Sequence, residues 1–288
     1  MFYRAFFCLL AVALRLDLTA QATGYRPAAN YAAGGKADQA KGAQILETFR
    51  RAGIAGSYWL SVELRIMPHQ GAERTVSGEL FGTRNEQGPL SRLILAGPAG
   101  ARSWLIQGGP QPALWLTDGT AADPVTRPVA DDKLLAPIDG SQGTDLTPFD
   151  LQMPFLYWTD FVYEGLARVR GRPADSFVLY PPADLAARQP SLTGVRVFID
   201  TQFQALVQAE LLGAKGVAEK TISILDLKKV GDQWIVQSID LRNNLTRDKT
   251  RFTVKAAALN LDLPAAVFDP AQLATAPAPV PAEKIQHF

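Results

Sequence analysis

The chain has 288 residues, and its 29 Lys and Arg against 28 Asp and Glu give a formal net charge of +1. A charge so close to zero provides no electrostatic basis for binding a polyanion, and the basic runs at 168–172 and 242–251 are short and mixed with other residues, which excludes nucleic-acid binding. With only His69, His287 and Cys8, the chain has no His-x-x-x-His or Cys-x-x-Cys metal spacing, so we predict no metal and no cofactor.

The first residues have the pattern of an export signal. A basic start containing Arg4 precedes the apolar run 5–14, and Ala-Gln-Ala at 20–22 is a small-x-small cleavage site. The apolar run is too short to span a bilayer, because about 20 apolar residues are needed, and no later segment approaches that length. We therefore predict a cleaved signal peptide at 1–22, a periplasmic location and a protein that is not integral to the membrane.

The rest of the chain is predicted to form one domain with two irregular ends. The Ala- and Gly-rich stretch 23–35 is expected to be flexible. Apolar residues within 36–52 then recur on one helical stripe that Gly53 ends. A single domain is predicted over 36–273, and the Ala- and Pro-rich tail 274–288 is expected to be extended and unpacked.

A long series of strands follows the predicted helix. From Tyr58 to Ile66 apolar residues alternate with other residues, which is the two-residue period of a half-buried strand. Further strands are expected at 75–82, 91–95, 102–107, 113–117, 165–170, 176–180, 194–200, 205–212, 219–230, 233–242 and 251–258. Turn signals such as Gly231-Asp232 separate them at hairpin spacing and leave no room for crossover helices. The fold class is therefore mainly β (α+β), with an antiparallel sheet, and Rossmann-type nucleotide binding is excluded.

An apolar stretch at 144–160 interrupts the strands. Asp145 and Thr147 have the character of a helix-entry or turn device. The apolar side chains that follow are Leu146, Phe149, Leu151, Met153, Phe155, Leu156, Tyr157 and Trp158. That is more apolar surface than an ordinary exposed loop carries, so the stretch either plugs the open end of the sheet or covers an apolar ligand.

No pattern of catalytic residues emerges. The chain contains no Gly-x-Ser-x-Gly elbow and no histidine within the predicted strands, so we predict that it is not an enzyme. The acidic loop 139–145 lacks the ligand order and closing glutamate of an EF-hand, which favours a solvated turn over a calcium site. A curved sheet that helices do not cover flush can enclose an apolar cavity, although a simply packed core would show the same alternation of residues.

Several segments, in their order along the chain, resemble the outer-membrane lipoprotein-sorting protein family of LolA-like periplasmic proteins. These segments are 145–151, 171–173, 195–200, 228–234, 246–252 and 267–273. The resemblance covers most of the chain, from near Gln44 to Leu273. It implies a strongly curved, unclosed antiparallel half-barrel, capped by helices, whose apolar cavity binds lipid without catalysis.

The resemblance also implies roles for individual residues. The alternation of residues then places Trp59 or its neighbours Tyr58 and Leu60 on the wall of the cavity, together with Val62, Leu64 and Leu80. The lid would contain Phe155, Leu156 and Trp158. The founding carriers hold their lid closed with a buried arginine, for which Arg65 is the candidate here.

The function implied is a soluble, monomeric periplasmic carrier of lipoprotein acyl chains or other lipids. An inner-membrane lipoprotein-release transporter and an outer-membrane acceptor would be its partners. Burial is favourable by about 0.8 kcal/mol per methylene, so an acyl anchor needs such a shield to cross water. A lipid-sensing or regulatory interaction module of the same fold is the alternative.

Overall fold

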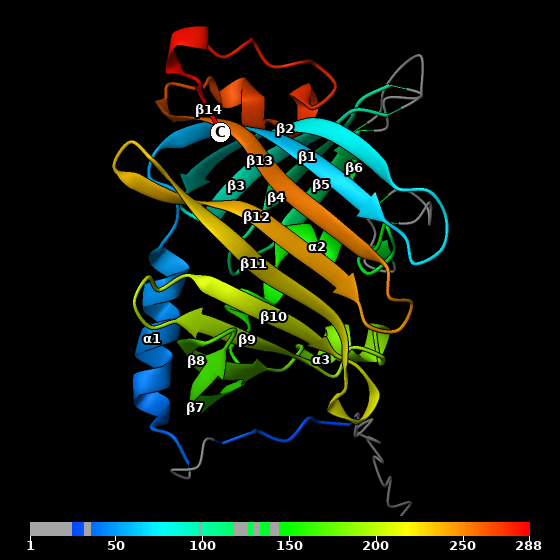
Figure 1. The fold of residues 1–288 in the computed structure, drawn as a ribbon, viewed down its shortest axis with the longest axis vertical. Helices are drawn as coiled ribbons and strands as arrows, with labels where there is room; N and C mark the ends of the chain where they lie inside the picture. Colours follow the sequence, from blue (N-terminus) through cyan, green and yellow to red (C-terminus); the bar gives the residue numbers. More distant parts are fainter. Residues whose placement is uncertain (1–24, 32–35, 98–99, 118–125, 129–132, 139–143) are drawn as a thin grey trace, which may run out of the picture.

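One antiparallel sheet dominates the computed structural model, which describes residues 25–31, 36–97, 100–117, 126–128, 133–138 and 144–288 (Figure 1). Its strands are β1 (Ser57–Met67), β2 (Arg74–Asn85), β3 (Gly88–Leu95), β4 (Arg102–Gln107), β5 (Ala113–Thr117), β6 (Thr126–Pro128), β7 (Phe161–Val169), β8 (Arg172–Leu179), β9 (Gly194–Asp200), β10 (Leu206–Leu212), β11 (Ala218–Val230), β12 (Gln233–Asn243), β13 (Lys249–Leu261) and β14 (Gln286–His287). The predicted signal peptide and the core of the loop weighed as a calcium site lie outside the described residues.

The helices are few and short. They are α1 (Gln39–Arg51), α2 (Pro148–Gln152) and α3 (Ala183–Arg188), with 3₁₀ turns η2 (Pro154–Tyr157), η3 (Ala214–Gly216), η4 (Ala265–Phe268), η5 (Pro270–Gln272) and η6 (Ala282–Lys284). Within the described parts of the chain, none of them is long and apolar enough to cross a membrane.

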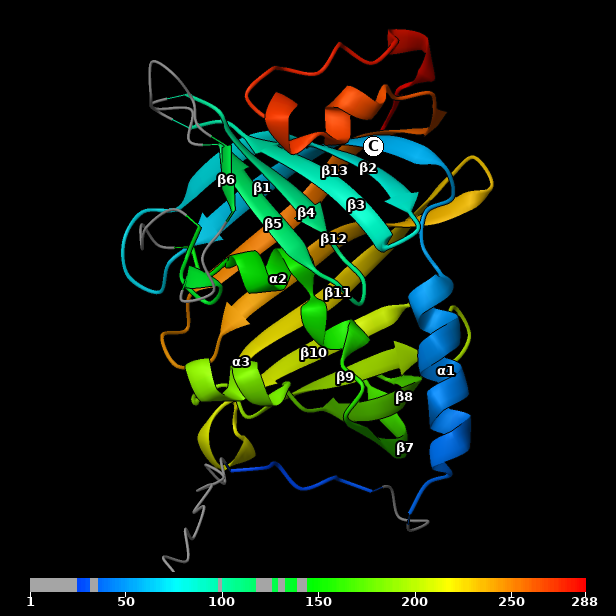
Figure 2. The same cartoon turned by 180° about the vertical axis from the view of Figure 1, so that it is seen from behind.

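The sheet consists of two meanders joined by the pairing of β1 with β13. The strand order is β6-β5-β4-β3-β2-β1-β13-β12-β11-β10-β9-β8-β7, and every neighbouring pair is antiparallel. β6 and β7 are the two edges, so the sheet does not close on itself. It curves around α2, η2 and α3, which lie on its inner face (Figure 2). The predicted fold class is thereby confirmed.

The helix predicted over 36–52 is α1. The Asp38 side chain caps it by accepting from the backbone N–H groups of Ala40 and Lys41, at 2.9 and 3.3 Å. The helix packs closely on edge strand β7, because a Cβ added at Gly42 would collide with the Tyr163 side chain. Glycine at this position therefore permits the contact between helix and sheet.

The two faces of β1 differ: one is continuously apolar, and the other carries the buried Trp59 among mostly polar and charged residues. Leu60, Val62 and Leu64 point into the main core on the inner face. Trp59 points the opposite way and packs with Phe81, its partner in β2, on the outer face. Successive side chains of a strand alternate between faces, so residues 59 and 60 cannot line the same cavity.

The C-terminal residues cover this outer cluster, and the prediction of an unpacked tail is wrong. Val280 and Ile285 pack against the Trp59 cluster, and β14 pairs with β13. The buried guanidinium of Arg92 donates to the carbonyl oxygens of Val267, Leu273 and Thr275 at 3.3, 2.9 and 2.6 Å. The apolar cluster around Trp59 and Phe81 on the outer face requires a cover, and the tail provides it.

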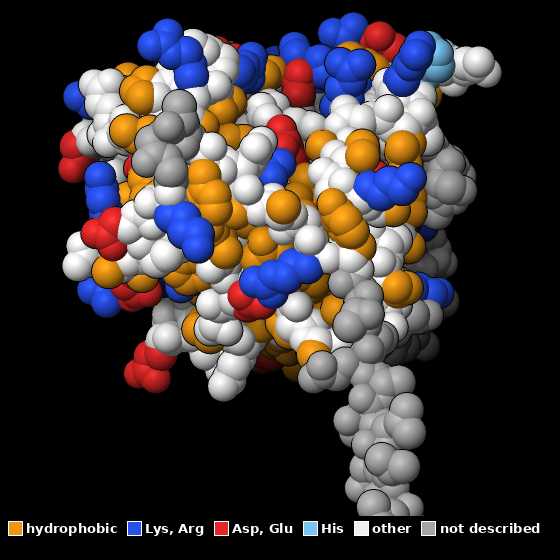
Figure 3. Space-filling view, turned by 90° about the horizontal axis from the view of Figure 1, so that it is seen from below, with side chains coloured by type: hydrophobic (Ala, Val, Ile, Leu, Met, Phe, Trp, Pro, Cys, Tyr) orange, Lys and Arg blue, Asp and Glu red, His pale blue; other side chains and the backbone are white. Residues whose placement is uncertain are grey.

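Part of the stretch predicted to be flexible is also packed. Residues 25–31, here called the strap, run along the β7 end of the molecule (Figure 1). Arg26 donates to both carboxylate oxygens of Asp160, at 2.6 and 2.8 Å, and lies over the ring of Tyr180. The Tyr180 hydroxyl donates to the Pro27 carbonyl at 2.8 Å. On this end of the molecule apolar side chains are interspersed with charged ones (Figure 3).

Candidate functional site

The apolar stretch inside the half-barrel, residues 146–158, is here called the lid. Thr147 and Asp150 form a capping box: the Thr147 hydroxyl accepts from the Asp150 N–H at 3.2 Å, and the Asp150 carboxylate accepts from the Thr147 N–H at 2.9 Å. Met153 adopts the left-handed region with a φ of 45°, and Pro154 starts a new turn. The lid is therefore two short turns rather than one continuous helix.

Three aromatic side chains of the lid pack together inside the half-barrel. The ring centroids of Phe149, Phe155 and Trp158 lie 5.6 to 6.4 Å apart. All three are buried in the main core. Aromatic pairs at such distances add a favourable contribution beyond area burial. In this structure the three lid aromatics are part of the packed core of the half-barrel.

A cation holds the end of the lid from outside the lid itself. Arg50, in the last turn of α1, donates from Nε to the Leu156 carbonyl at 2.6 Å and from Nη2 to the Trp158 carbonyl at 2.9 Å. Burial lowers the pKa of this guanidinium below its ordinary value. Hydrogen bonds that involve a charged group are about twice as strong as neutral ones. Arg50 thus joins α1 to the lid.

Arg65, the residue considered as a latch from the sequence, does not reach the lid. Its guanidinium instead pairs with Glu73 at 2.6 Å on the surface. The assignment to Arg65 is therefore wrong. The signal for Arg50 in the sequence is a basic residue at the end of a helix, and that position alone does not reveal which carbonyls the side chain reaches.

A second cation holds the start of the lid. Lys220 of β11 lies 2.7 Å from a carboxylate oxygen of Asp150, which is buried. Its ammonium also donates to the backbone carbonyl of Asp145, and the Asn243 side chain donates to the Asp145 carboxylate at 2.9 Å. Both ends of the lid are therefore attached by polar contacts from other elements.

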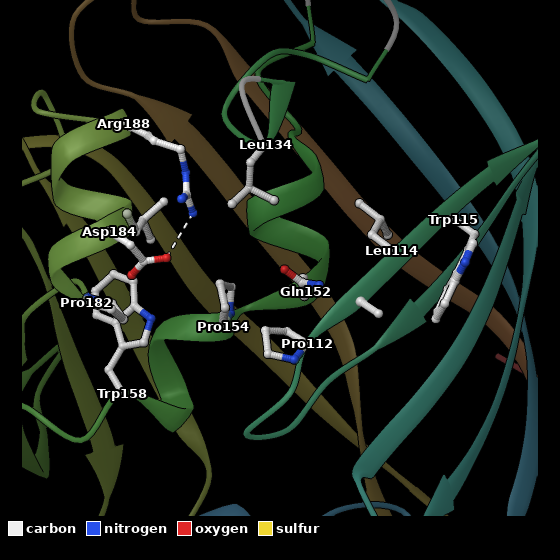
Figure 4. Close-up of a pocket in the computed structure, with 12 residues that line it drawn as sticks. Pro112, Leu114, Trp115, Leu134, Gln152, Pro154, Trp158, Pro182, Asp184 and Arg188 are labelled. Carbon is white, nitrogen blue, oxygen red and sulfur yellow. Dashed lines mark hydrogen bonds and ion pairs between the residues drawn. The ribbon is translucent and has the colours of Figure 1, made fainter. Parts of the chain in front are cut away.

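A cavity of about 340 Å³ remains beside the lid. Its lining residues are Pro112, Ala113, Leu114, Trp115, Leu134, Gln152, Pro154, Trp158, Pro182, Asp184, Leu185 and Arg188. Figure 4 shows α3 on one side of it and β5 on the other, with the lid between them. The wall is mostly apolar, and the ion pair of Asp184 and Arg188, at 3.1 Å, lies among its polar lining. The volume is at the lower end of the roughly 300 to 1,000 Å³ of ligand pockets.

The structure brings most of the predicted site residues together. Eight of the nine belong to the main core or pack against it: Tyr58, Leu60, Val62, Leu64, Leu80, Phe155, Leu156 and Trp158. Trp59 is the exception, because it lies on the outer face. Only Trp158 of the predicted set lines the cavity. The cavity residues on β5 and α3 were missed, since nothing in the sequence indicates that these elements face the lid.

The fold and site define a class: an unclosed antiparallel half-barrel with an internal lid and a residual apolar cavity. A family model described only as an uncharacterized protein matches residues 142–275. No curated protein matches the chain.

Solved structures share this architecture. A putative outer membrane lipoprotein-sorting protein domain from Vibrio parahaemolyticus superposes with a TM-score of 0.68 at 16% identity, covering 81% of this chain and 96% of that one. A DUF1329 family protein from Desulfovibrio piger gives 0.69 at 14% identity, covering 81% and 98%. A LolA superfamily protein from Nitrosomonas europaea gives 0.58 at 15% identity, covering 79% and 96%. The chain therefore has a LolA-like fold, and the resemblance stated from the sequence is confirmed at the level of fold.

Proposed function

We propose that this protein is a periplasmic carrier that shields the acyl chains of lipoproteins or other lipids inside its half-barrel. The observation that supports this function best is the construction of the lid. The lid fills an apolar concavity, yet Arg50 and Lys220 attach it mainly through side chains that bind its carbonyls and one carboxylate. A segment attached in this way can move without breaking the strand pairing of the sheet.

The resting cavity and the size of the ligand require such a movement. About 340 Å³ is small for the two or three acyl chains of a lipoprotein anchor. Moving Phe149, Phe155 and Trp158 outward would expose apolar surface of the lid and of the wall. Acyl chains that enter would cover that surface again, at about 0.8 kcal/mol per buried methylene, and so offset the free energy of opening.

The location and partners belong to the same proposal. A signal peptide at 1–22 would export the chain to the periplasm, where a release transporter in the inner membrane would load it and an outer-membrane acceptor would unload it. The carrier would act as a monomer and without catalysis. A pull-down that recovers a membrane signalling protein in place of such a transporter would instead favour the regulatory module of the same fold.

The test is to identify what the protein binds when it is purified from membrane-containing cells. Mass spectrometry of extracted lipids should find acyl-bearing molecules in a reproducible ratio to protein, and a fluorescent fatty-acid probe should compete with them. Replacing Ala113, which lines the cavity, by Phe should weaken binding of the probe about tenfold or more.

A matched control separates the cavity from general effects of an added aromatic ring. Ala187→Phe places the same side chain on the exposed side of α3, outside the cavity lining, and should leave binding of the probe unchanged. A protein that carries no lipid and binds no acyl probe would refute the carrier function.

A further inference from the structure

The two strands β10 and β11 pair along only part of their length. Their pairing joins residues 208–212 with residues 218–223. β11 then continues to Val230, and beyond residue 223 its one strand partner among the described residues is β12. The pairing of β11 with β12 has register shifts between Ile224 and Leu227. The two strands diverge here, at the α1 side of the sheet in Figure 1. A pocket lies at this place and is here called the slit.

The slit is a pocket beside the open part of β11 that is lined by both apolar and charged side chains. Its volume is about 330 Å³, and it is lined by Arg172, Asp200, Phe203, Ala205, Leu206, Val207, Ile224, Leu225, Asp226, Leu227 and Trp234. Leu206 and Ile224 belong to the main core, whereas Val207 belongs to a separate cluster on the outer face. Residues of both faces of the sheet therefore line the pocket, and it shares no lining residue with the cavity beside the lid.

Two exposed aromatic side chains span the slit. Phe203, in the turn before β10, and Trp234, at the start of β12, have ring centroids 6.3 Å apart. They are 42% and 55% exposed, and both line the pocket. Large exposed aromatic residues around a pocket are typical of interaction sites.

The backbone edge of β11 also faces the slit. Arg170, from the turn between β7 and β8, donates from Nη1 to the Ile224 carbonyl at 3.2 Å. A side chain thus takes the place that a neighbouring strand would occupy. Backbone groups of an open strand edge need hydrogen-bond partners, and an extended peptide can supply them along its length. A hydrocarbon chain has no hydrogen-bonding groups and cannot supply such partners.

The charges at the slit favour an acidic partner. Lys228 and Lys229 lie on the open part of β11, and the Lys228 ammonium is 5.3 Å from the centroid of the Phe288 ring. Arg170 reaches the same strand with its bond to the Ile224 carbonyl. The two acidic lining residues are already engaged: Asp200 pairs with Arg172 at 3.1 Å, and Asp226 accepts from the Ser238 hydroxyl at 2.8 Å.

We propose that the slit binds an extended peptide segment of a partner protein, with apolar and acidic side chains in alternation, as an added strand on the edge of β11. In this mode of recognition main-chain hydrogen bonds supply affinity and pockets for alternate side chains supply specificity. The apolar side chains of the peptide would enter the pocket beneath Phe203 and Trp234. The site is separate from the lid and its cavity, so it does not depend on the function proposed above.

The experiment measures binding of an acetylated, fluorescein-labelled peptide of about eight residues with alternating valine and glutamate, a typical strand length. The full chain should bind it, and hydrogen exchange of the amides in 224–230 should slow about tenfold or more at saturation. Trp234→Ala should weaken binding about tenfold. Leu245→Ala removes another exposed apolar side chain, which lies outside the slit, and should leave binding unchanged.

Two further probes decide how the slit is occupied. The same peptide with alternate backbone amides N-methylated should lose binding, and binding that survives N-methylation would overturn the added-strand geometry. Laurate should leave exchange in 224–230 unchanged. Protection by laurate without protection by the peptide would make the slit an acyl-chain portal and overturn the proposal. Absence of binding by every probe would also overturn it and leave the slit as a protected strand edge.

Discussion

The Gln39 side chain pairs with the backbone of Tyr163 as a neighbouring strand would. Its Oε1 accepts from the Tyr163 N–H at 2.8 Å, and its Nε2 donates to the Tyr163 carbonyl at 2.9 Å. Tyr163 lies in β7, an edge strand of the sheet, so the first residue of α1 covers part of an edge that would otherwise be open.

Replacing Gln39 by Leu should therefore destabilise the protein by about 1–2 kcal/mol, the contribution of two neutral hydrogen bonds. Urea unfolding measures the change, and the Tyr163 amide should exchange faster with solvent. Gln44→Leu makes the same substitution at an exposed position of α1 and should stay within about 0.5 kcal/mol of the parent. Equal effects of the two variants would contradict the pairing.

Removing the Arg50 side chain should release the end of the lid. Arg50→Ala deletes two charge-assisted hydrogen bonds to the carbonyls of Leu156 and Trp158, which are worth about 1.5–3 kcal/mol each. Local opening of residues 154–158 should become at least tenfold more frequent, as hydrogen exchange of their amides would show. Arg51→Ala is the control, because Arg51 pairs only with exposed Glu47 among the contacts that the structure gives it.

Lys220 should be far more important to stability than an exposed lysine. Lys220→Met would leave the buried carboxylate of Asp150 without its cation and should cost about 3–5 kcal/mol. Adding Asp150→Asn should recover part of this loss, because the amide carries no charge. Chemical unfolding of the two single variants and the double variant measures the coupling. Additive losses would show that the two side chains do not interact.

The strap should loosen at acid pH. The hydrogen bond from Arg26 lowers the pKa of Asp160 below its usual value, so the folded state favours the ionised carboxylate. This contribution is fully present above the unfolded pKa of about 3.9 and is lost as the pH falls through the folded value. Both side chains are about half exposed, at 54% and 55%, so solvent screening keeps the effect below about 1 kcal/mol.

The measurement compares Asp160→Asn with the parent by urea unfolding from neutral pH downward. The variant should be less stable at neutral pH, and the difference should shrink as the pH falls below about 4. A difference that stays constant over this range would rule out the ion pair as its cause. Asp184→Asn, which removes an exposed pair in α3, should change stability by less than about 0.5 kcal/mol.

Truncation of the C-terminal residues should expose the outer cluster. A chain that ends at Thr275 keeps the carbonyl groups that Arg92 binds but loses Val280, Ile285 and β14. Loss of partial burial for two aliphatic side chains predicts a destabilisation of about 2 kcal/mol or more. Stronger binding of a hydrophobic dye and a red shift of tryptophan emission, from Trp59, should accompany it. Unchanged emission would place the tail away from Trp59.

The sequence revealed the strands through their periodicity, because alternation is a local property of neighbouring residues. It could not assign Trp59, the buried aromatic residue on the mostly polar face of β1, because the segments that cover this side chain lie far along the chain. The same limit applies to the tail: its Ala- and Pro-rich composition predicted an unpacked segment, although Val280 and Ile285 pack against the outer cluster. Arg50 was missed because its partners lie 106 and 108 residues away.

The pairing of β1 with β13 governs how this molecule can fold. The pairing joins Ser57 to Leu261, near opposite ends of the chain, and it is the connection between the two meanders. Each meander can form from local hairpins. The backbone groups on one edge of β1, however, stay unpaired until β13 has been synthesised and has paired with them. Loops of this length close slowly, and open strand edges associate with other chains. We therefore expect assembly of the two halves to limit the rate of folding and the half-formed sheet to be the species most prone to aggregation.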